Sequence, residues 1–429
     1  MGRLGRNLGL LEALAIGVGS MIGAGIFVLS GNAAQLAGPA VTISFGLSGL
    51  SVLLTALSFV ELATAMPRAG GPYVYVREAF GETLGFLIGW SLWVGLALAT
   101  AFYAIGFAQY VHVLFRSIGI PIVSVVTVLF LLAINLVGSK SAGKLQNAVV
   151  LLLLLSLAVY IAAGWNEVDR ALHSPFLPYG WEPVVSTSAS VFVSFLGFEL
   201  IATAAEELRN PKRDLPLATI SSVIGVTLLY VLVLYVATGL MPHFDLGQTR
   251  TPISDTARRS LGPIGVVVAV IGGLLATLSS ANTSIMASSR IAWAMARDHL
   301  IPGFLASVHR KWSSPHAAVG VTGVIVLGAL LMEDVTILAG AAGFLHLYPF
   351  LAVNLAVLKM RGRKNYQPTF RVPGGPVLPV TAAVSTLVLL TKVHLHDFAW
   401  GMVLVLPGAL YYIATGRYGL SRLWADRRT

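Results

Sequence analysis

Long apolar segments alternate with short polar or Gly/Pro-rich connections along most of the chain. Because a helix rises about 1.5 Å per residue, about 20 apolar residues cross the hydrocarbon core of a bilayer, and segments of this length predict membrane-spanning helices. The division between the ninth and tenth spans rests on Glu333 and Asp334, which interrupt an otherwise continuous apolar pattern. Twelve spans are predicted, at residues 10–37, 40–66, 83–115, 120–138, 142–164, 184–208, 217–241, 263–297, 317–332, 335–359, 377–393 and 398–416.

The first apolar segment is dense in glycine. Four glycines lie from Gly17 to Gly25, and each costs a helix about 1 kcal/mol relative to alanine. This composition predicts an unwound turn within the span. Exposed backbone is tolerated at membrane depth only where it lines a cavity in the protein, so the stretch is a candidate ligand site built from main chain. The alternative is that the small residues let neighbouring helices pack closely, as in Gly-xxx-Gly contacts.

A second break is predicted in the sixth span, where Glu199 follows Gly197 closely. A carboxylate inside a membrane span is costly, which makes Glu199 a candidate functional residue. The alternative is a structural acid that is protonated or hydrogen-bonded to backbone opened by the break. Spans one and six occupy equivalent places if the chain consists of two five-span halves followed by two further spans.

An odd number of spans per half makes the second half enter the membrane from the opposite side, so the halves are inverted. Inverted repeats with a broken helix in each half are typical of secondary transporters, which hold their substrate between the breaks. The predicted fold is an all-α polytopic membrane protein with about twelve transmembrane helices, a 5+5 inverted repeat with broken helices 1 and 6, and two extra helices. The predicted transporter domain is 1–416, with repeats at 10–164 and 184–359, additional helices at 377–416 and a basic cytoplasmic tail at 417–429.

Composition supports a membrane protein. Hydrophobic residues make up 56% of the 429 residues and charged residues 11%, whereas soluble domains have about 25% charged residues. With twelve spans, 22 of the 28 Lys and Arg residues fall on the side of the N-terminus, which predicts cytoplasmic termini and a cell-membrane location. The net charge is +10, but the basic residues are spread over many loops, and this spread argues against nucleic-acid binding.

Other classes of site lack their motifs in this sequence. There is no cysteine, which excludes disulfides and thiolate metal sites. There is no His-Glu-x-x-His metal motif and no Gly-x-Ser-x-Gly nucleophile elbow, so an enzyme is not expected. We expect no cofactor and no obligatory protein partner.

Five motifs together resemble the amino acid–polyamine–organocation superfamily of permeases, whose LeuT-like fold has this repeat. They occur in the superfamily's order over nearly the whole chain. The motifs are GSMIGAGIF at 19–27, SFLGFE at 194–199, the segment from EE to NPKRDLP at 206–216, the segment from SR to MARDHLIP at 289–302, and FRVPGGP at 370–376.

The resemblance implies a secondary transporter that recognises the common end of an α-amino acid. In the superfamily, main-chain amides of the first break hold the substrate carboxylate. Here these are the amides of Gly23, Ala24 and Gly25, with Ile22 adjacent. The substrate α-ammonium group would contact carbonyls that lack partners, at Met21 in the first break and at Val193 and Leu196 in the second.

Side-chain selectivity is expected to come from the pocket wall. Apart from Glu199 the wall candidates are uncharged, which favours a neutral, apolar amino acid. The alternatives are a cationic amino-acid or polyamine exchanger and a non-transporting amino-acid sensor on the same scaffold. The wall candidates are Phe192, Val193, Ser194, Phe195 and Gly197 in span six, Thr100 in span three and Ser284 in span eight.

The coupling mechanism stays open at the level of sequence. Proton-linked relatives carry a lysine in span five where this chain has Leu153. Glu199 and His346 are the candidates for proton coupling, and exchange or uniport needs neither. Weak candidates for a sodium site are Thr283, Ser284 and Ser288.

Acidic residues near the inner span ends have two interpretations. Glu61, Glu206 and Glu207 either form an inner gate with an arginine or lie in solvated or interfacial pairs, and the second is favoured. The candidate partners are Arg68, Arg209 and Arg290.

Overall fold

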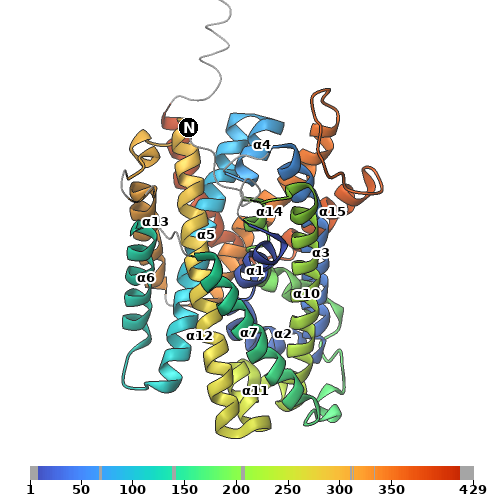
Figure 1. The fold of residues 1–429 in the computed structure, drawn as a ribbon. Coiled ribbons are helices and arrows are strands. Elements are labelled where there is room, and N and C mark those ends of the chain that lie inside the picture. Colours follow the sequence, from blue (N-terminus) through green and yellow to red (C-terminus); the bar gives the residue numbers. More distant parts are fainter. Residues whose placement is uncertain are drawn as a thin grey trace, which may run out of the picture.

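The helices of the chain pack side by side in one bundle, as Figure 1 shows. The computed structural model describes residues 8–66, 70–137, 142–203, 208–309, 312, 314–332 and 334–415, and these residues are almost entirely helical. The short helix α4 (Pro72–Phe80) lies at one end of the bundle and α11 (His243–Gly247) at the other (Figure 1).

The remaining helices follow the order of the apolar segments. In the first part of the chain they are α1 (Leu10–Met21), α2 (Ala24–Ala37), α3 (Val41–Ala65), α5 (Glu82–Leu114), α6 (Ile120–Val137) and α7 (Ala142–Trp165). Next come α8 (Trp181–Ser190), α9 (Glu199–Thr203), α10 (Pro211–Leu240), α12 (Pro252–Arg297), α13 (His316–Ala329), α14 (Val335–Arg361), α15 (Val377–Thr391) and α16 (Leu395–Ala414). The 3₁₀ helices are η1 (Gly38–Ala40), η2 (Arg170–His173), η3 (Val191–Phe195), η5 (Gly303–Ala306) and η6 (Leu330–Met332).

Most of these helices are long and apolar enough to cross a membrane. Nine such stretches occur in the described part of the chain, and the first of them, Leu10–Ala65, contains both of the first two predicted spans. Two shorter apolar helices, His316–Met332 and Val377–Thr391, coincide with the ninth and eleventh predicted spans. The prediction of a multi-pass helical membrane protein is therefore confirmed.

Helix α5 lies in the core of the bundle and packs along α12 and α14. Residues 91–106 of α5 are all buried, as expected of a helix that is apolar on every side. Small residues allow the close approach of α12: a β-carbon on Gly273 would lie 2.8 Å from the ring of Tyr110. Within α12, Gly262 has φ 59° and separates a first segment from the predicted span that starts at Pro263.

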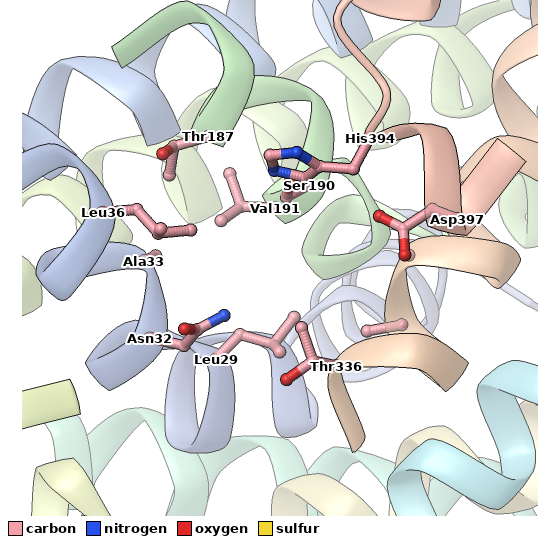
Figure 2. Close-up of a pocket in the computed structure, with 12 residues that line it drawn as sticks. Leu29, Asn32, Ala33, Leu36, Thr187, Ser190, Val191, Thr336, His394 and Asp397 are labelled. Atoms are coloured by element: carbon pink, nitrogen blue, oxygen red, sulfur yellow. The ribbon is translucent and has the colours of Figure 1, made fainter. Parts of the chain in front are cut away.

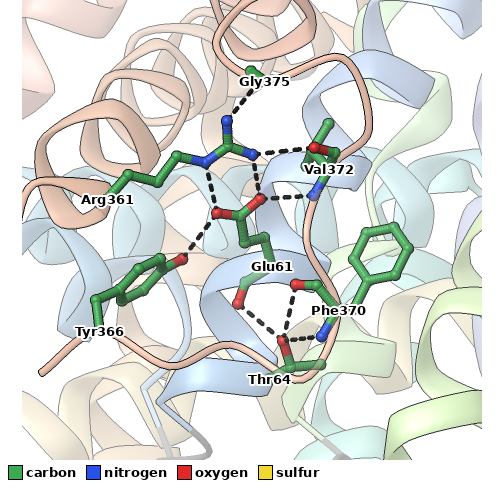
Figure 3. Close-up of polar contacts among 7 residues, drawn as sticks. All are labelled: Glu61, Thr64, Arg361, Tyr366, Phe370, Val372 and Gly375. Carbon is green, nitrogen blue, oxygen red and sulfur yellow. Dashed lines mark hydrogen bonds and ion pairs between the residues drawn. The ribbon is translucent and has the colours of Figure 1, made fainter.

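Glu61, near the end of α3, is completely buried and has a full set of partners (Figure 3). Its carboxylate accepts hydrogen bonds from Arg361, with Nε to Oε1 at 2.8 Å and Nη2 to Oε2 at 2.5 Å. The backbone N–H of Val372 donates to Oε2 at 2.7 Å, and the Tyr366 hydroxyl donates to Oε1 at 3.3 Å. Arg361 also donates to the carbonyls of Val372 and Gly375. Such a bidentate pair is among the strongest charge-assisted hydrogen bonds.

This network anchors the segment after α14 to α3. Burial and the neighbouring Glu61 carboxylate raise the pKa of Tyr366, so its hydroxyl stays protonated and able to donate. The expectation that Glu61 lies in a solvated or interfacial pair is wrong, because Arg361 pairs with it in the interior. Three of the other residues considered for an inner gate, Arg68, Glu206 and Glu207, lie outside the described residues.

Replacing Glu61 by glutamine is expected to destabilise the protein strongly. Removing one partner of a buried ion pair costs about 3–5 kcal/mol, because the other charge is left without compensation. Thermal unfolding of the detergent-purified protein measures the effect as a lower midpoint for E61Q.

The matched control is Glu182→Gln, which removes an acid from an exposed pair with Lys392 at 3.5 Å. Exposed pairs contribute about 0–1 kcal/mol, so E182Q should unfold close to the wild-type temperature. Equal midpoints for E61Q and E182Q would show that the Glu61 network does not hold the fold together.

Candidate functional site

The first helix is interrupted inside the glycine-rich stretch. Helix α1 ends at Met21 and α2 begins at Ala24, so Ile22 and Gly23 form the break. Ile22 has extended backbone angles (φ −77°, ψ 96°), and Gly23 has φ −136° and ψ −149°. Residues 19–31 are all buried, so the break lies inside the protein, as lipid-depth backbone must.

A second interruption lies in the predicted sixth span. Helix α8 tightens into η3, Leu196 is extended (φ −63°, ψ 140°), and α9 begins at Glu199. Gly197 has φ 118°, a backbone conformation that side-chain-bearing residues rarely adopt. The conformation at Gly197 explains why a glycine is needed at this point of the span.

The two breaks pack directly against each other. A β-carbon on Gly25 would lie 2.5 Å from the Cα of Ser194, and one on Gly197 would lie 2.5 Å from the Cβ of Ser20. Each break therefore uses a glycine to approach a serine of the other break. The close-packing interpretation of the glycines thus has a structural basis at the breaks, and the main-chain ligand site stays a prediction.

Side-chain hydroxyls from two other helices donate to the carbonyls at the end of α1. The Tyr230 hydroxyl of α10 lies 2.8 Å from the Met21 carbonyl and 3.0 Å from the Ser194 carbonyl, so it bridges the two breaks. Ser280 of α12 lies 3.2 Å from the Ser20 carbonyl and 3.3 Å from the Ile22 carbonyl. In addition, Ser279 donates to the Gly19 carbonyl at 3.2 Å.

Sequence reasoning missed Tyr230, Ser279 and Ser280. Nothing local marks these residues, since each lies in an apolar or small-residue run like many others in the chain. The available signal was only that a hydroxyl inside a membrane span needs an acceptor, and a serine usually finds one in its own helix.

The expectation that the Met21 and Val193 carbonyls lack partners is wrong. Met21 accepts from Tyr230, and Val193 accepts from the backbone N–H of Leu196 at 3.2 Å. A carbonyl oxygen has two lone pairs, so each can still accept a second hydrogen bond.

The start of α2 places main-chain N–H groups at the first break. The first N–H groups of a helix have no acceptor within the helix, and here they belong to residues that follow Gly23. The helix dipole adds a partial positive charge at this end. The first break therefore combines donors suited to an anion with carbonyls suited to a cation within a few residues.

Comparisons with known proteins place the sequence of this chain in a family. A sequence profile described as amino acid permease matches residues 8–409. The chain belongs to the amino acid permease family. It is 31% identical to the branched-chain amino acid permease BcaP of Bacillus subtilis (strain 168), over 96% of this chain and 94% of the relative. It is also 31% identical to the methylthioribose transporter of that organism (89% and 87% covered) and 30% identical to the vacuolar cationic amino acid transporter 4 of Arabidopsis thaliana (86% and 65% covered).

The wall candidates of span six lie at the second break, whereas Thr100 and Ser284 lie on α5 and α12. Phe192 packs on Phe350 of α14, with ring centroids 5.8 Å apart, and Phe195 packs on Tyr230 at 5.2 Å. Val193, between them, is completely buried. Thr100 is buried in α5 and donates to its own helix, at the Leu96 carbonyl, 2.8 Å away. Buried Ser284 lies one helical turn beyond Ser280 on α12.

Two buried ionisable side chains of the permease each have one atom without a partner among the described residues. Glu199 accepts from the backbone N–H of Gly197 at 2.9 Å through Oε2, while its Oε1 has no such partner. His346 contacts the Ala342 carbonyl through Nδ1 at 2.7 Å, while its Nε2 has none. The His346 ring also lies 5.9 Å from that of Phe350, which in turn packs on Phe192.

The sodium candidates hydrogen-bond to backbone in this structure. Thr283 lies 3.1 Å from the carbonyls of Ser279 and Ser280, and Ser288 donates to the Trp93 carbonyl at 2.9 Å. Within the described residues no group of three His, Cys, Asp or Glu side chains could hold a metal ion. In span five of the permease, Leu153 is completely buried.

Main-chain hydrogen bonding also joins the segment before α1 to the segment that precedes α10. Before α1, Leu8 forms an isolated bridge with Leu208, and the Arg209 N–H donates to the Leu8 carbonyl at 2.9 Å. The segments that lead into α1 and out of α9 are therefore fixed to each other, as are the breaks themselves.

Gly25→Ala is expected to destabilise the permease by about 1–3 kcal/mol, as overpacking does, because the new methyl group would overlap Ser194. Gly46 of α3 is the matched control, since a β-carbon there meets nothing within 4 Å. Gly46→Ala should stabilise the helix by about 1 kcal/mol. Thermal unfolding in detergent compares the two variants, and a stabilised Gly25→Ala variant would mean that the breaks do not pack as described.

Proposed function

We propose that this permease is a secondary transporter that moves α-amino acids, with a preference for neutral, apolar ones, across the cell membrane by alternating access. The observation that carries the proposal is the pair of helix breaks that pack against each other, Ile22–Gly23 and Leu196–Phe198, each of which interrupts the main-chain hydrogen bonding of a helix inside the protein. Family membership supports transport, and the breaks supply a place for the substrate.

In the proposed binding mode the substrate carboxylate lies at the start of α2. The amides of Gly23, Ala24 and Gly25 would donate to it, and the helix dipole favours the negative charge. The α-ammonium group would donate to the second lone pairs of the Met21 and Val193 carbonyls and to the Leu196 carbonyl. Such a site recognises the part that all α-amino acids share.

We further propose a LeuT-like arrangement of about twelve spans. The repeats would be 10–164 and 184–359, with two additional helices at 377–416 and a cytoplasmic tail at 417–429. The nine apolar stretches, the two shorter apolar helices and the presence of one break in each half support this arrangement. The excess of basic residues on the side of the N-terminus supports cytoplasmic termini.

The proposed side-chain pocket is apolar. Phe192, Val193 and Phe195 line the second break and are completely buried, and the relative BcaP is named for branched-chain amino acids. Transport of cationic amino acids is the second candidate, because the Oε1 atom of Glu199 is a buried acceptor without a partner among the described residues. Several relatives are named as cationic amino acid transporters.

For coupling, we propose a proton at Glu199 in preference to sodium. The Oε1 atom of Glu199 is a buried carboxylate oxygen without a partner among the described residues, and a proton would remove the cost of burying its charge. His346 is the second proton candidate, and Thr283, Ser284 and Ser288 remain the sodium candidates.

Uptake into liposomes that contain the purified protein tests the proposed function. Labelled leucine, isoleucine, valine, methionine, lysine and arginine are supplied outside, with and without unlabelled amino acid inside, a pH step or sodium. We expect leucine, isoleucine or valine to give the highest flux and a proton gradient to increase it. Flux of lysine and arginine alone would favour the cationic candidate, and no flux of any amino acid would refute transport.

Tyr230→Phe is expected to weaken amino-acid binding about tenfold. The hydroxyl bridges both breaks, and the loss of one buried hydrogen bond costs about 0.5–1.5 kcal/mol. Binding of the best-transported amino acid to the purified variant measures the change.

Tyr110→Phe serves as the control, because that hydroxyl also donates to a buried α2 carbonyl, Phe27, at 2.8 Å, but not to a break. Both variants lose a similar hydrogen bond, and only Tyr230→Phe should lose affinity. Equal affinity of the two variants would remove Tyr230 from the proposed site.

A further inference from the structure

A cavity of about 50 Å³ lies between α2, α8, α14 and the start of α16 (Figure 2). A cavity of this volume holds a few water molecules or an ammonium group, whereas a whole amino acid is too large for it. Its polar lining residues are Asn32, Thr187, Ser190, Thr336, His394 and Asp397.

The cavity has a buried carboxylate in its wall. The Asp397 side chain is 10% exposed, and its carboxylate lies against the backbone of Gly340 on α14, where a β-carbon would overlap it. The titratable groups around Asp397 are His396, whose Nδ1 lies 3.8 Å from Oδ1, together with His394 and Asp334. Among the described residues, no lysine or arginine forms an ion pair with Asp397.

A hydroxyl of the lining lacks a partner within the described part of the chain. Thr187 is 1% exposed, and its hydroxyl has no hydrogen-bond partner among the described residues. Figure 2 shows Asp397 on one side of the cavity and the amide of Asn32 on the other. A buried unpaired hydroxyl is costly unless something binds it, and a buried carboxylate without a lysine or arginine partner favours a cation.

Two of the helices that line the cavity, α2 and α8, belong to the broken spans. Leu29 and Asn32 lie on α2, which begins directly after the first break. Ser190 ends α8, and Val191 begins η3, which leads to the second break. The cavity therefore lies between the breaks and the side of the membrane predicted to be outside.

We propose that Asp397 is an ammonium-binding residue of an outer subsite, where the α-ammonium group of an amino acid binds before it reaches the breaks. This inference rests on the proposed function. Asp397 belongs to α16, beyond the two proposed repeats, so the additional helices acquire a role in substrate recognition. Helix α16 supplies a carboxylate, α2 an amide and α8 a hydroxyl to the cavity lining, and each of these groups can accept a hydrogen bond from an ammonium group.

The test compares Asp397→Asn with Asp334→Asn in liposomes, using the amino acid that the wild type transports best. Asp334 is exposed, carries the same charge at the start of α14 and lies outside the cavity lining. Its carboxylate caps α14 at Thr336 N–H (2.8 Å), a role that asparagine also fills. The control thus removes one negative charge from the same face without changing the cavity.

We expect Asp397→Asn to lower the uptake rate about tenfold at substrate concentrations far below KM, the lower end of the range for electrostatic focusing in clefts. The saturating rate and the unfolding temperature should not change, and Asp334→Asn should behave as wild type. Gly340→Ala keeps the carboxylate but displaces it, and should reproduce the loss at low concentration.

Three outcomes would overturn the proposal while amino-acid transport itself stands. Wild-type kinetics in Asp397→Asn, or equal losses in Asp397→Asn and Asp334→Asn, would show that the carboxylate has no specific role. A parallel fall in saturating rate and unfolding temperature would make its role structural. A wild-type rate that depends on sodium, with that dependence lost in Asp397→Asn, would assign the subsite to an inorganic cation. A wild type without any flux would refute the proposed function as well.

Discussion

The structure depends on one constraint: backbone polar groups at membrane depth must find partners inside the protein. Two helices break within the bundle, and each break exposes carbonyls and amides that a continuous helix would satisfy. The protein meets this need by packing the breaks together and by aiming hydroxyls of α10 and α12 at the freed carbonyls. Tyr230 does so for both breaks at once, so the geometry of one break depends on that of the other.

The locations of the breaks could be predicted because their cause is local. Gly23 and Gly197 weaken the helices in which they lie, and the length of each apolar segment indicates a span regardless of what packs on it. The partners could not be predicted, because Tyr230 is 209 residues from Met21 and Arg361 is 300 residues from Glu61. The choice among hydroxyls on α12 depends on its packing register against α1, which brings Ser280 rather than Ser284 to the break.

At the end of the bundle that holds α4, away from the breaks, charged side chains form ion pairs. Arg361 and Glu61 fix the segment after α14 onto α3, and Arg77 pairs with Asp298 at 2.5 Å to fix α4 onto the end of α12. Tyr73 adds a second hydrogen bond to Asp298 at 2.8 Å. These ion pairs connect helices through their ends, so the middle of the bundle, where the breaks lie, contains few charges and Glu199 stands out there.

A site built from main chain has a consequence for selectivity. In the proposed binding mode, amides and carbonyls of the breaks would contact only the carboxylate and ammonium groups, so they would contribute equally to every α-amino acid. Discrimination among amino acids then has to come from the side-chain wall, where exchanging Phe192 or Val193 changes the pocket without disturbing the breaks. In the proposed binding mode, this division would account for relatives that are named for branched-chain and for cationic amino acids.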